Sequence, residues 1–260
     1  MKIVTLLENT TMKEELKPAH GLSFYIETNG LHLLFDVGPD SSFWQNATQM
    51  GIDLALVDAV VISHGHNDHG GGLSYFLEHN QRANVYLHPT ALQHFYACAL
   101  GKQNEISLPA ELKEHPRVVL TGDSFTITEN LQLFAGVTER QCFSHANDTL
   151  FVQGPAGLQQ DSFQHEQNLL VREGGKQILF SGCAHCGVLN ILQKAEAAYG
   201  KIDGMIGGFH LYNPTLQQVE EKTLVQEIAR QLQQRPTKFY SCHCTGQLPY
   251  QWLKEILGDQ

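Results

Sequence analysis

Short apolar segments with polar breaks dominate the first third of this chain of 260 residues. Strands are predicted at Lys2–Leu7, Leu22–Thr28 and Leu31–Asp36, and Asn29-Gly30 between the last two is typical of a β-hairpin. The almost entirely apolar segment Val57–Ile62 predicts a strand that is covered on both faces. The chain therefore begins with a predicted sheet whose last strand is deeply buried.

Helices and strands are then predicted to alternate. The expected helices are Ser41–Met50, Leu73–His79, Pro89–Leu100, Val188–Tyr199, Thr215–Gln234 and Leu248–Leu257. Further strands are expected at Val85–His88, in a meander over Val118–Val152, and at Asn168–Arg172, Gln177–Ser181, Ile202–Ile206 and Lys238–Ser241. Gly101–Pro116 and Gly154–Phe163 are expected to be irregular loops. This order favours an α+β fold of two mixed sheets packed face to face with helices outside, as one large domain or two small ones.

Charge and hydropathy argue against nucleic acid and membranes as binding partners. Lys and Arg number 17 against 27 Asp and Glu, a formal net charge of -10, so no cationic field attracts nucleic acid. We find no apolar run near the ~20 residues that span a bilayer and no signal peptide at the start, so we expect no membrane partner and a cytoplasmic location. The sequence does not indicate the oligomeric state.

Candidate chemistry gathers directly after the buried strand. His64, His66, Asp68 and His69 lie within six residues and are followed by three glycines, which can turn the backbone tightly. Imidazole and carboxylate are ligands that zinc, manganese and iron accept. The alternation of His64 and His66 can direct both rings to one metal, while Asp68 and His69 serve a second. The alternative is a polar loop with solvated histidines.

The HxHxDH segment resembles the signature of the metallo-β-lactamase superfamily, whose fold is a four-layer αββα sandwich. "HGLSF" (His20–Phe24) and "LFDVG" (Leu34–Gly38) fit its first sheet. "GCAHCGVLN" (Gly182–Asn190), "GGFHL" (Gly207–Leu211) and "CHCTG" (Cys242–Gly246) resemble a branch named after an archaeal 7,8-dihydropterin-6-methyl-4-(ribofuranosyl)aminobenzene-5'-phosphate synthase. The resemblance implies a single metallo-β-lactamase-like domain over residues 1–260.

The resemblance also implies a ligand set. His64, His66 and His185 would bind one metal, and Asp68, His69 and His243 a second. The wider superfamily usually has a bridging Asp where this chain has Cys183, so both one and two metals stay open. Zinc is the expected cofactor, with manganese or iron as alternatives. The superfamily's oxygen-reducing di-iron members have Glu at the position of His66, which argues against that activity.

Three further residues are expected to bind substrate. His210 lies between apolar residues after two glycines and would hold a phosphate or oxyanion, unless it is only a hydrogen-bonded histidine at the edge of the core. Thr245 and Gly246 would offer a hydroxyl and a backbone N–H to the same group. Asp68 is expected to orient the attacking hydroxide as well as to bind metal. His165 and Glu166 are expected to form hydrogen bonds that position the metal ligands rather than to bind metal themselves.

Four cysteines have competing interpretations. Cys183 and Cys186 form CxxC, and Cys242 and Cys244 form CxC, so the four thiolates are also consistent with a structural zinc. A disulfide framework or a dithiol redox motif fits the spacing less well, because His185 and His243 stand inside the pairs. Buried cysteines can also be inert.

A metal-bound water, with its pKa lowered to about 7, would favour hydrolysis or group transfer. The leading hypothesis is a metal-dependent hydrolase or group-transfer enzyme, such as a phosphoesterase or dihydropterin synthase-like protein, that acts on a small anionic substrate of phosphorylated or pterin-like structure. One alternative is a lactone, ester or thioester hydrolase with the same site. The other is a metal-binding sensor module without turnover.

Overall fold

Two six-stranded sheets form the centre of the molecule, which is described by a computed structural model of residues 1–260 apart from the side chain of Ala110. In the first sheet the order is β1 (Lys2–Leu7), β2 (Ser23–Thr28), β3 (Leu31–Phe35), β4 (Ala59–Val61), β5 (Asn84–Leu87) and β8 (Val118–Leu120). In the second it is β18 (Lys238–Ser241), β15 (Gly204–Gly207), β14 (Lys176–Phe180), β13 (Asn168–Glu173), β10 (Leu131–Phe134) and β9 (Ser124–Thr128). Both sheets mix parallel and antiparallel pairs.

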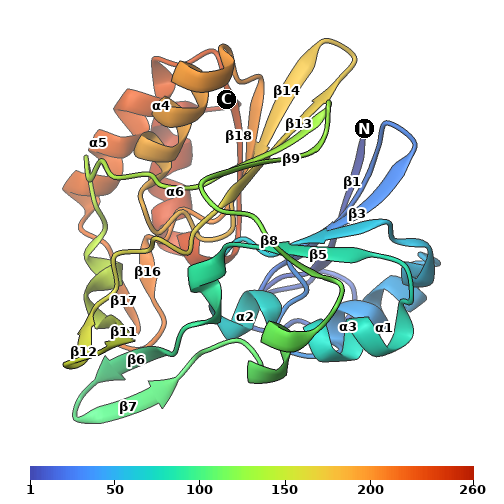
Figure 1. Cartoon of the computed structure of the whole chain (residues 1–260). Coiled ribbons are helices and arrows are strands. Elements are labelled where there is room, and N and C mark those ends of the chain that lie inside the picture. The colour runs from blue at the N-terminus through green and yellow to red at the C-terminus, as the bar shows by residue number, and fades with distance from the viewer.

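Helices cover the outer faces of the sheets (Figure 1). The helices on the first sheet are α1 (Ser42–Gln49), α2 (Asn67–Gly70) and α3 (Leu73–His79). Those on the second are α4 (Val188–Tyr199), α5 (Lys222–Gln233) and α6 (Gln247–Leu257). Short 3-10 turns are η1 (Leu54–Leu56), η2 (Pro89–Leu92), η3 (Ala110–Glu114), η4 (His145–Thr149) and η5 (His243–Thr245). The predicted αββα sandwich is confirmed.

Three apolar cores correspond to the layers. The inner core joins the facing sides of the sheets, with Phe24 and Phe35 from the first against Leu169 and Phe180 from the second. A second core fills the space between the first sheet and its helices, and a third does the same for the second sheet. The strand that contains Val60 is fully buried, as its apolar sequence predicts.

Two smaller sheets extend the sandwich at one end. The four-stranded one has the order β12 (Gly157–Gln160), β11 (Leu150–Gly154), β6 (Phe95–Ala99) and β7 (Lys102–Glu105), and the two-stranded one pairs β16 (Tyr212–Asn213) with β17 (Gln218–Val219). The β6–β7 hairpin projects from the lower end of the molecule (Figure 1). The expectation of a single domain over the whole chain stays a prediction.

The structure corrects the predicted elements around these small sheets. Pro89–Leu100 is a 3-10 turn followed by strand β6, in which Phe95 and Ala97 are buried alternately with less buried neighbours. Gly101–Pro116 contains β7 and η3, and Gly154–Phe163 contains β12. Pairing between strands distant in sequence, which local propensity does not report, decides these segments.

Two more predicted boundaries were wrong. The helix expected to begin at Thr215 begins at Lys222, because Gln218–Val219 pairs with β16 instead. The strands between Val118 and Val152 do not form one meander, since β8 joins the first sheet, β9 and β10 the second, and β11 the small one.

Candidate metal centre

The HxHxDH segment lies in the loop and short helix that follow β4. His64 and His69 are fully buried, and His66 is 4% exposed. Gly71 permits the loop to pass close to its neighbours, because a Cβ atom there would lie 2.4 Å from the Pro39 carbonyl oxygen. The segment therefore places several donor side chains in a small volume beside the sheet edge.

The later histidines come from the ends of three adjacent parallel strands. His185 follows β14, His210 follows β15 and His243 follows β18, and these strands are paired in parallel. Carboxyl ends of parallel strands meet at one edge of a sheet, so residues far apart in sequence become neighbours there. His210 and His243 both have positive φ values, 46° and 49°, in the turns that leave the strands.

His69 and His243 face each other across the first close contact. Their Nε2 atoms are 3.1 Å apart. The Nδ1 atom of His69 lies 2.6 Å from an Asp36 carboxylate oxygen, and that of His243 lies 2.8 Å from the Asn9 Oδ1 atom. These oxygens accept hydrogen bonds, so each Nδ1 carries a proton, and in the neutral form of each ring the lone pair is on Nε2.

His64 and His185 form a second close contact, with 3.3 Å between their Nε2 atoms. The Nδ1 atom of His185 donates to the Asn147 Oδ1 atom at 2.9 Å. The Nδ1 atom of His64 donates to the Ser63 hydroxyl at 2.8 Å, while that hydroxyl donates to Asp36. Two lone pairs at this distance repel each other unless a proton or a cation lies between them.

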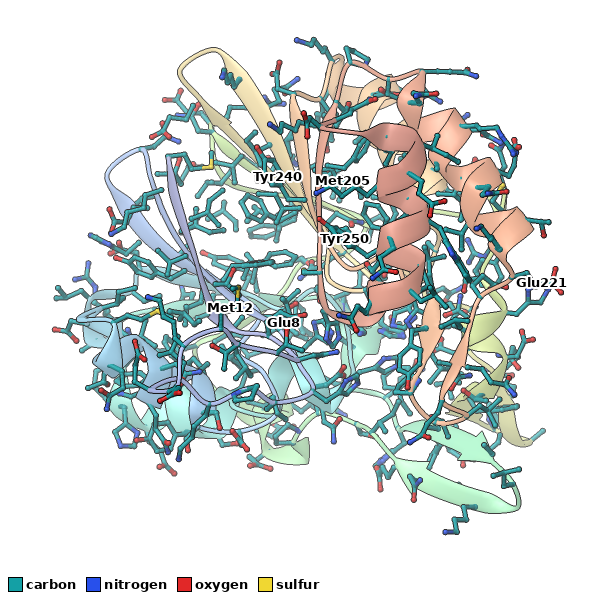
Figure 2. The ribbon with its side chains drawn as sticks, turned by 180° about the vertical axis from the view of Figure 1, so that it is seen from behind. Glu8, Met12, Met205, Glu221, Tyr240 and Tyr250 are labelled. Carbon is teal, nitrogen blue, oxygen red and sulfur yellow. The ribbon has the colours of Figure 1, made fainter. Side chains whose placement is uncertain are left out.

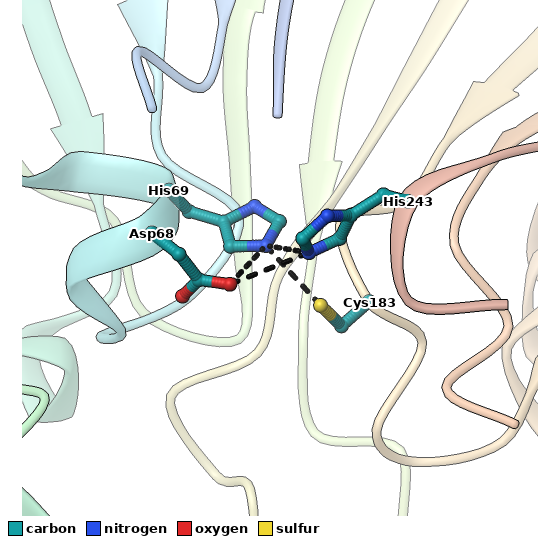
Figure 3. Close-up of side chains that lie close together, drawn as sticks. All are labelled: Asp68, His69, Cys183 and His243. Carbon is teal, nitrogen blue, oxygen red and sulfur yellow. Dashed lines mark hydrogen bonds and ion pairs between the residues drawn. The ribbon is translucent and has the colours of Figure 1, made fainter. Parts of the chain in front are cut away.

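The predicted ligands are brought together in two adjacent groups. The rings of His64, His66 and His185 are mutually close, with centroids 4.6 to 5.0 Å apart. Asp68, His69 and His243 form the second group, in which an Asp68 carboxylate oxygen lies 3.5 Å and 3.3 Å from the two Nε2 atoms. Figure 3 shows this second group with the side chain of Cys183 beside it.

Protonation differs between the groups. Burial, together with neighbouring imidazoles, lowers the pKa of His64 and His185 well below the ordinary value, so both rings are neutral. Burial also lowers the pKa of His66. For His69, burial favours the neutral ring, but the carboxylates of Asp68 and Asp36 outweigh it and raise the pKa to about 9. Burial alone would raise the pKa of Asp68, but the imidazoles of His69 and His243 outweigh it and hold the pKa well below its usual range.

Comparison with known proteins agrees with this geometry. Residues 16–139 match the model of the metallo-beta-lactamase superfamily. The structure is similar over 98% of this chain and 93% of the other to Tm1679, described as a metal-dependent hydrolase of the beta-lactamase superfamily, with a TM-score of 0.79 and 25% identity. In both sequence and fold, the chain is therefore similar to members of the metallo-β-lactamase superfamily.

Two relatives come from Methanocaldococcus jannaschii. The chain is 26% identical over 263 residues to its 7,8-dihydropterin-6-methyl-4-(beta-D-ribofuranosyl)-aminobenzene-5'-phosphate synthase, covering 95% of this chain and 88% of the relative. It is 27% identical over 218 residues to an uncharacterised protein of the same organism, covering 80% and 79%. The metallo-β-lactamase fold implies divalent metal binding, and the convergent nitrogen atoms fit such an ion.

Cys183 is a candidate metal donor that the sequence analysis did not assign as a ligand. Its Sγ atom lies 3.1 Å from the Nε2 atom of His69, and the side chain is part of three candidate donor groups. Its position after Gly182, where relatives usually have the bridging Asp, was the available signal. Cys183 is therefore placed to contact either metal position.

Supporting residues were also missed. Asp36, in the "LFDVG" segment, is fully buried and holds His69 and the Ser63 backbone N–H. Asp161 accepts a hydrogen bond from the Nε2 atom of His165 at 2.9 Å and lies 3.8 Å from the Nε2 atom of His66. The only sequence signal for the supporting role of Asp36 was its charge at the end of a mostly apolar strand. No local sequence pattern indicated a supporting role for Asp161.

The predicted supporting role of His165 and Glu166 agrees with their contacts. The Nδ1 atom of His165 accepts the backbone N–H of Gly65 at 2.8 Å. The Glu166 carboxylate accepts the backbone N–H groups of His185 and Cys186 at 2.6 and 2.9 Å. Glu166 thus fixes the turn that carries a predicted ligand.

Two of the three predicted substrate-binding residues, Thr245 and Gly246, lie beside His243, and the third, His210, lies beside His185. His210 packs against His185, with ring centroids 4.1 Å apart. The Thr245 hydroxyl accepts the backbone N–H of Phe209 at 2.9 Å, so it is already engaged within the chain. Thr245 and Gly246 line a cavity, and the substrate roles of all three residues stay predictions.

Two cavities adjoin the candidate centre. One, of about 500 Å³, includes His66 and Asp68 in its lining together with Lys102 and other residues of the β6–β7 hairpin. The other, of about 620 Å³, lies beside His243 and has Tyr212 and Tyr250 in its lining. Figure 2 labels Glu8 and Tyr250, which line the second cavity from opposite ends of the chain. Both volumes suit a small molecule.

The cysteines are all free thiols in the part of the chain that the structure describes. The candidate donor groups found among the described residues contain Cys183 and Cys244 but neither Cys186 nor Cys242, so the alternative four-thiolate zinc site does not form. Among the described residues, no helix has the length and apolar character to cross a membrane.

Proposed function

We propose that this chain is a metal-dependent enzyme that hydrolyses, or transfers a group from, a small phosphorylated or pterin-like substrate. One observation supports the metal dependence above all others: two pairs of buried imidazole Nε2 atoms approach to 3.1 and 3.3 Å while their Nδ1 atoms are engaged elsewhere. Such lone pairs suit a divalent cation. Zinc is favoured by histidine and cysteine donors, and manganese or iron are alternatives.

The residues divide between two metal positions in this proposal. His64, His66 and His185 would hold one ion, and Asp68, His69 and His243 the other, with Cys183 within reach of both. When bound, such ions lower the pKa of a coordinated water and polarise the bond under attack.

The protein's own groups prepare the centre for this chemistry. Asp36, Asn147 and Asn9 fix the proton of a ligand ring on Nδ1 and so keep Nε2 directed inward. Asp68 is ionised, and its carboxylate can orient the attacking water by accepting a hydrogen bond from it. We propose catalytic orientation by Asp68 on this basis, in addition to metal binding.

An anionic substrate fits the cavity beside His66. Lys102 lines that cavity, and Asn67 and Asn104 offer hydrogen-bond donors next to it. The bound metals would add positive charge that the acidic chain otherwise lacks. The tyrosines of the second cavity offer flat surfaces for a ring. The similarity to the M. jannaschii dihydropterin phosphate synthase supports the same substrate class.

Metal content per chain tests the metal centre. Elemental analysis of protein purified without chelator should give at least two metals per chain for the wild type and one fewer for His243→Ala. His94→Ala, at an exposed histidine paired with Glu105, is the matched control and should keep both metals. One metal that His243→Ala leaves in place would contradict the two-metal arrangement.

Turnover tests the reaction class. With zinc, manganese or iron restored, the enzyme should cleave a phosphodiester or phosphomonoester probe, bis(p-nitrophenyl) phosphate or p-nitrophenyl phosphate, faster than a lactone or thioester. Preference for the lactone or thioester would favour the other hydrolase, and metal retained without any rate above buffer would favour a sensor module.

A further inference from the structure

A sulfur-rich group lies beside the candidate metal centre, on the side of the second sheet. Cys183, His210 and Cys244 each present a donor atom, and these atoms all lie within 4.8 Å of one another. The three residues follow β14, β15 and β18 and are 3%, 5% and 3% exposed. The group shares Cys183 with the histidine and aspartate groups but adds two residues that those groups do not contain.

His210 has an unusual environment in this group. Both of its ring nitrogen atoms are buried, and neither has a hydrogen-bond partner among the described residues. Almost all buried polar atoms in native proteins are paired, because an unpaired one loses its hydration without compensation. His210 thus places an unpaired, buried ring nitrogen within 4.8 Å of two sulfur atoms, which makes it a candidate ligand for an ion at this position.

The adjacent backbone is shaped to admit the sulfur of Cys244. A Cβ atom on Gly208 would lie 2.4 Å from the Cys244 Sγ atom, so a side chain at this position would displace the thiol. The Cys244 thiol lies 3.5 Å from the Cys183 carbonyl oxygen, which holds it next to the other cysteine. Glycine in the "GGFHL" segment is therefore required for the two cysteines and His210 to meet.

We propose that Cys183, His210 and Cys244 bind one thiophilic divalent cation, such as zinc or cadmium, at a site next to the histidine and aspartate groups. Two thiolates and one imidazole form a soft donor set that prefers such ions over magnesium or calcium. Cys183 would bridge this ion to the neighbouring centre. The site does not depend on the enzymatic function proposed above.

Cadmium is the probe for this site. Zinc-loaded protein is equilibrated with Cd²⁺ and desalted, and the bound metals are counted while thiolate-to-cadmium charge transfer is recorded in the ultraviolet. The wild type should hold one more cation per chain than Cys244→Ser and show about twice its charge-transfer absorption, since two thiolates become one. Cys186→Ser, a matched change at a buried cysteine outside the donor groups, should behave as the wild type.

Equal cation counts and equal spectra for the wild type and Cys244→Ser would overturn the proposal. A Cys183–Cys244 disulfide in the protein as purified, detected by mass spectrometry without reductant, would overturn it as well.

His210→Ala gives a second test that keeps both sulfur atoms. It should weaken Cd²⁺ at this site by at least tenfold in a competition titration while the other metals stay bound. An unchanged Cd²⁺ affinity would exclude His210 as a ligand and overturn the three-residue site. Circular dichroism of the metal-free variants verifies folding, and His210→Ala decides the matter if Cys244→Ser does not fold.

Discussion

The two halves of this molecule contribute to the metal centre in different ways. The first half supplies His64, His66, Asp68 and His69 from one segment of six residues. One buried carboxylate, Asp36, contacts both the residue before this segment and the segment's last ligand. The second half supplies single residues from the ends of three separate strands. Proximity in the first half comes from the chain itself, and in the second from the sheet.

Each residue supplied by the second half has its own distant support. Glu8 accepts the backbone N–H of His243 at 2.7 Å across 235 positions of sequence. Glu166 does the same for His185, and Glu220 accepts the Ser144 hydroxyl, which also contacts the His210 carbonyl oxygen at 2.6 Å. The comparison shows that a scattered site needs more anchors than a contiguous one, because each turn must be fixed separately.

Removal of one ligand from each half should have the largest effect and tests whether the halves are equivalent. His64→Ala and His185→Ala should each remove the same metal and reduce turnover by more than a thousandfold, because both rings face one position. Metal analysis and turnover of the phosphate probes give the result. Turnover by metal-free His64→Ala protein would contradict the mechanism.

Asp36→Asn should have the next largest effect, on the first half. The amide keeps the volume but loses the charge that stabilises the His69 Nδ1 proton, so affinity for the second metal should fall about 10- to 100-fold. Competition with a chromogenic chelator measures it. Asp58→Asn, at a partly exposed carboxylate that pairs with Arg82 away from the candidate centre, should leave the metal affinity unchanged.

Glu166→Gln should have a smaller effect, confined to the second half. The amide group would place N–H donors against one of the N–H groups of His185 and Cys186, so the turn should loosen and metal affinity at His185 should fall about tenfold. The chelator competition should show no loss for Glu78→Gln on the exposed face of α3. If Glu166→Gln lost as much metal affinity as Asp36→Asn, the two halves of the molecule would not differ in how strongly their ligands depend on supporting residues.

Glu220→Gln should have the smallest effect and should depend on pH. Burial alone would raise the pKa of Glu220, but hydrogen bonds from the Glu221 N–H, His145 and Ser144 outweigh it and lower the pKa. A lowered carboxyl pKa stabilises the fold above the unfolded pKa, about 4.3, and that stability is lost as the pH falls through the folded value.

The variant should therefore be about 2 kcal/mol less stable than the wild type at pH 7, and the difference should shrink under acid conditions. The free energy of unfolding is measured by urea denaturation of the metal-free wild type and variant, once at pH 7 and once at a pH below the unfolded carboxyl pKa of about 4.3. A difference that is the same at both pH values would mean that the carboxylate charge does not contribute.

The same contrast explains what could be predicted from sequence. The hairpin at Asn29-Gly30, the buried strand around Val60 and the HxHxDH segment are local patterns, and the structure has the hairpin and the strand as predicted. His185 and His243 were found through resemblance, because nothing local marks a residue whose partners are elsewhere in the chain. Cys183, Asn147 and Asn9 act through contacts between distant segments, and β6 forms a strand through pairing with β11.

The β6–β7 hairpin lies apart from the segments that carry the proposed metal ligands. It forms a wall of the cavity beside His66 and carries Lys102, while Leu100 at its tip is 89% exposed. The ligands proposed for the metals come from other segments. Under the proposed function, exchange of this hairpin should change which substrate the cavity accepts without altering the proposed metal ligands.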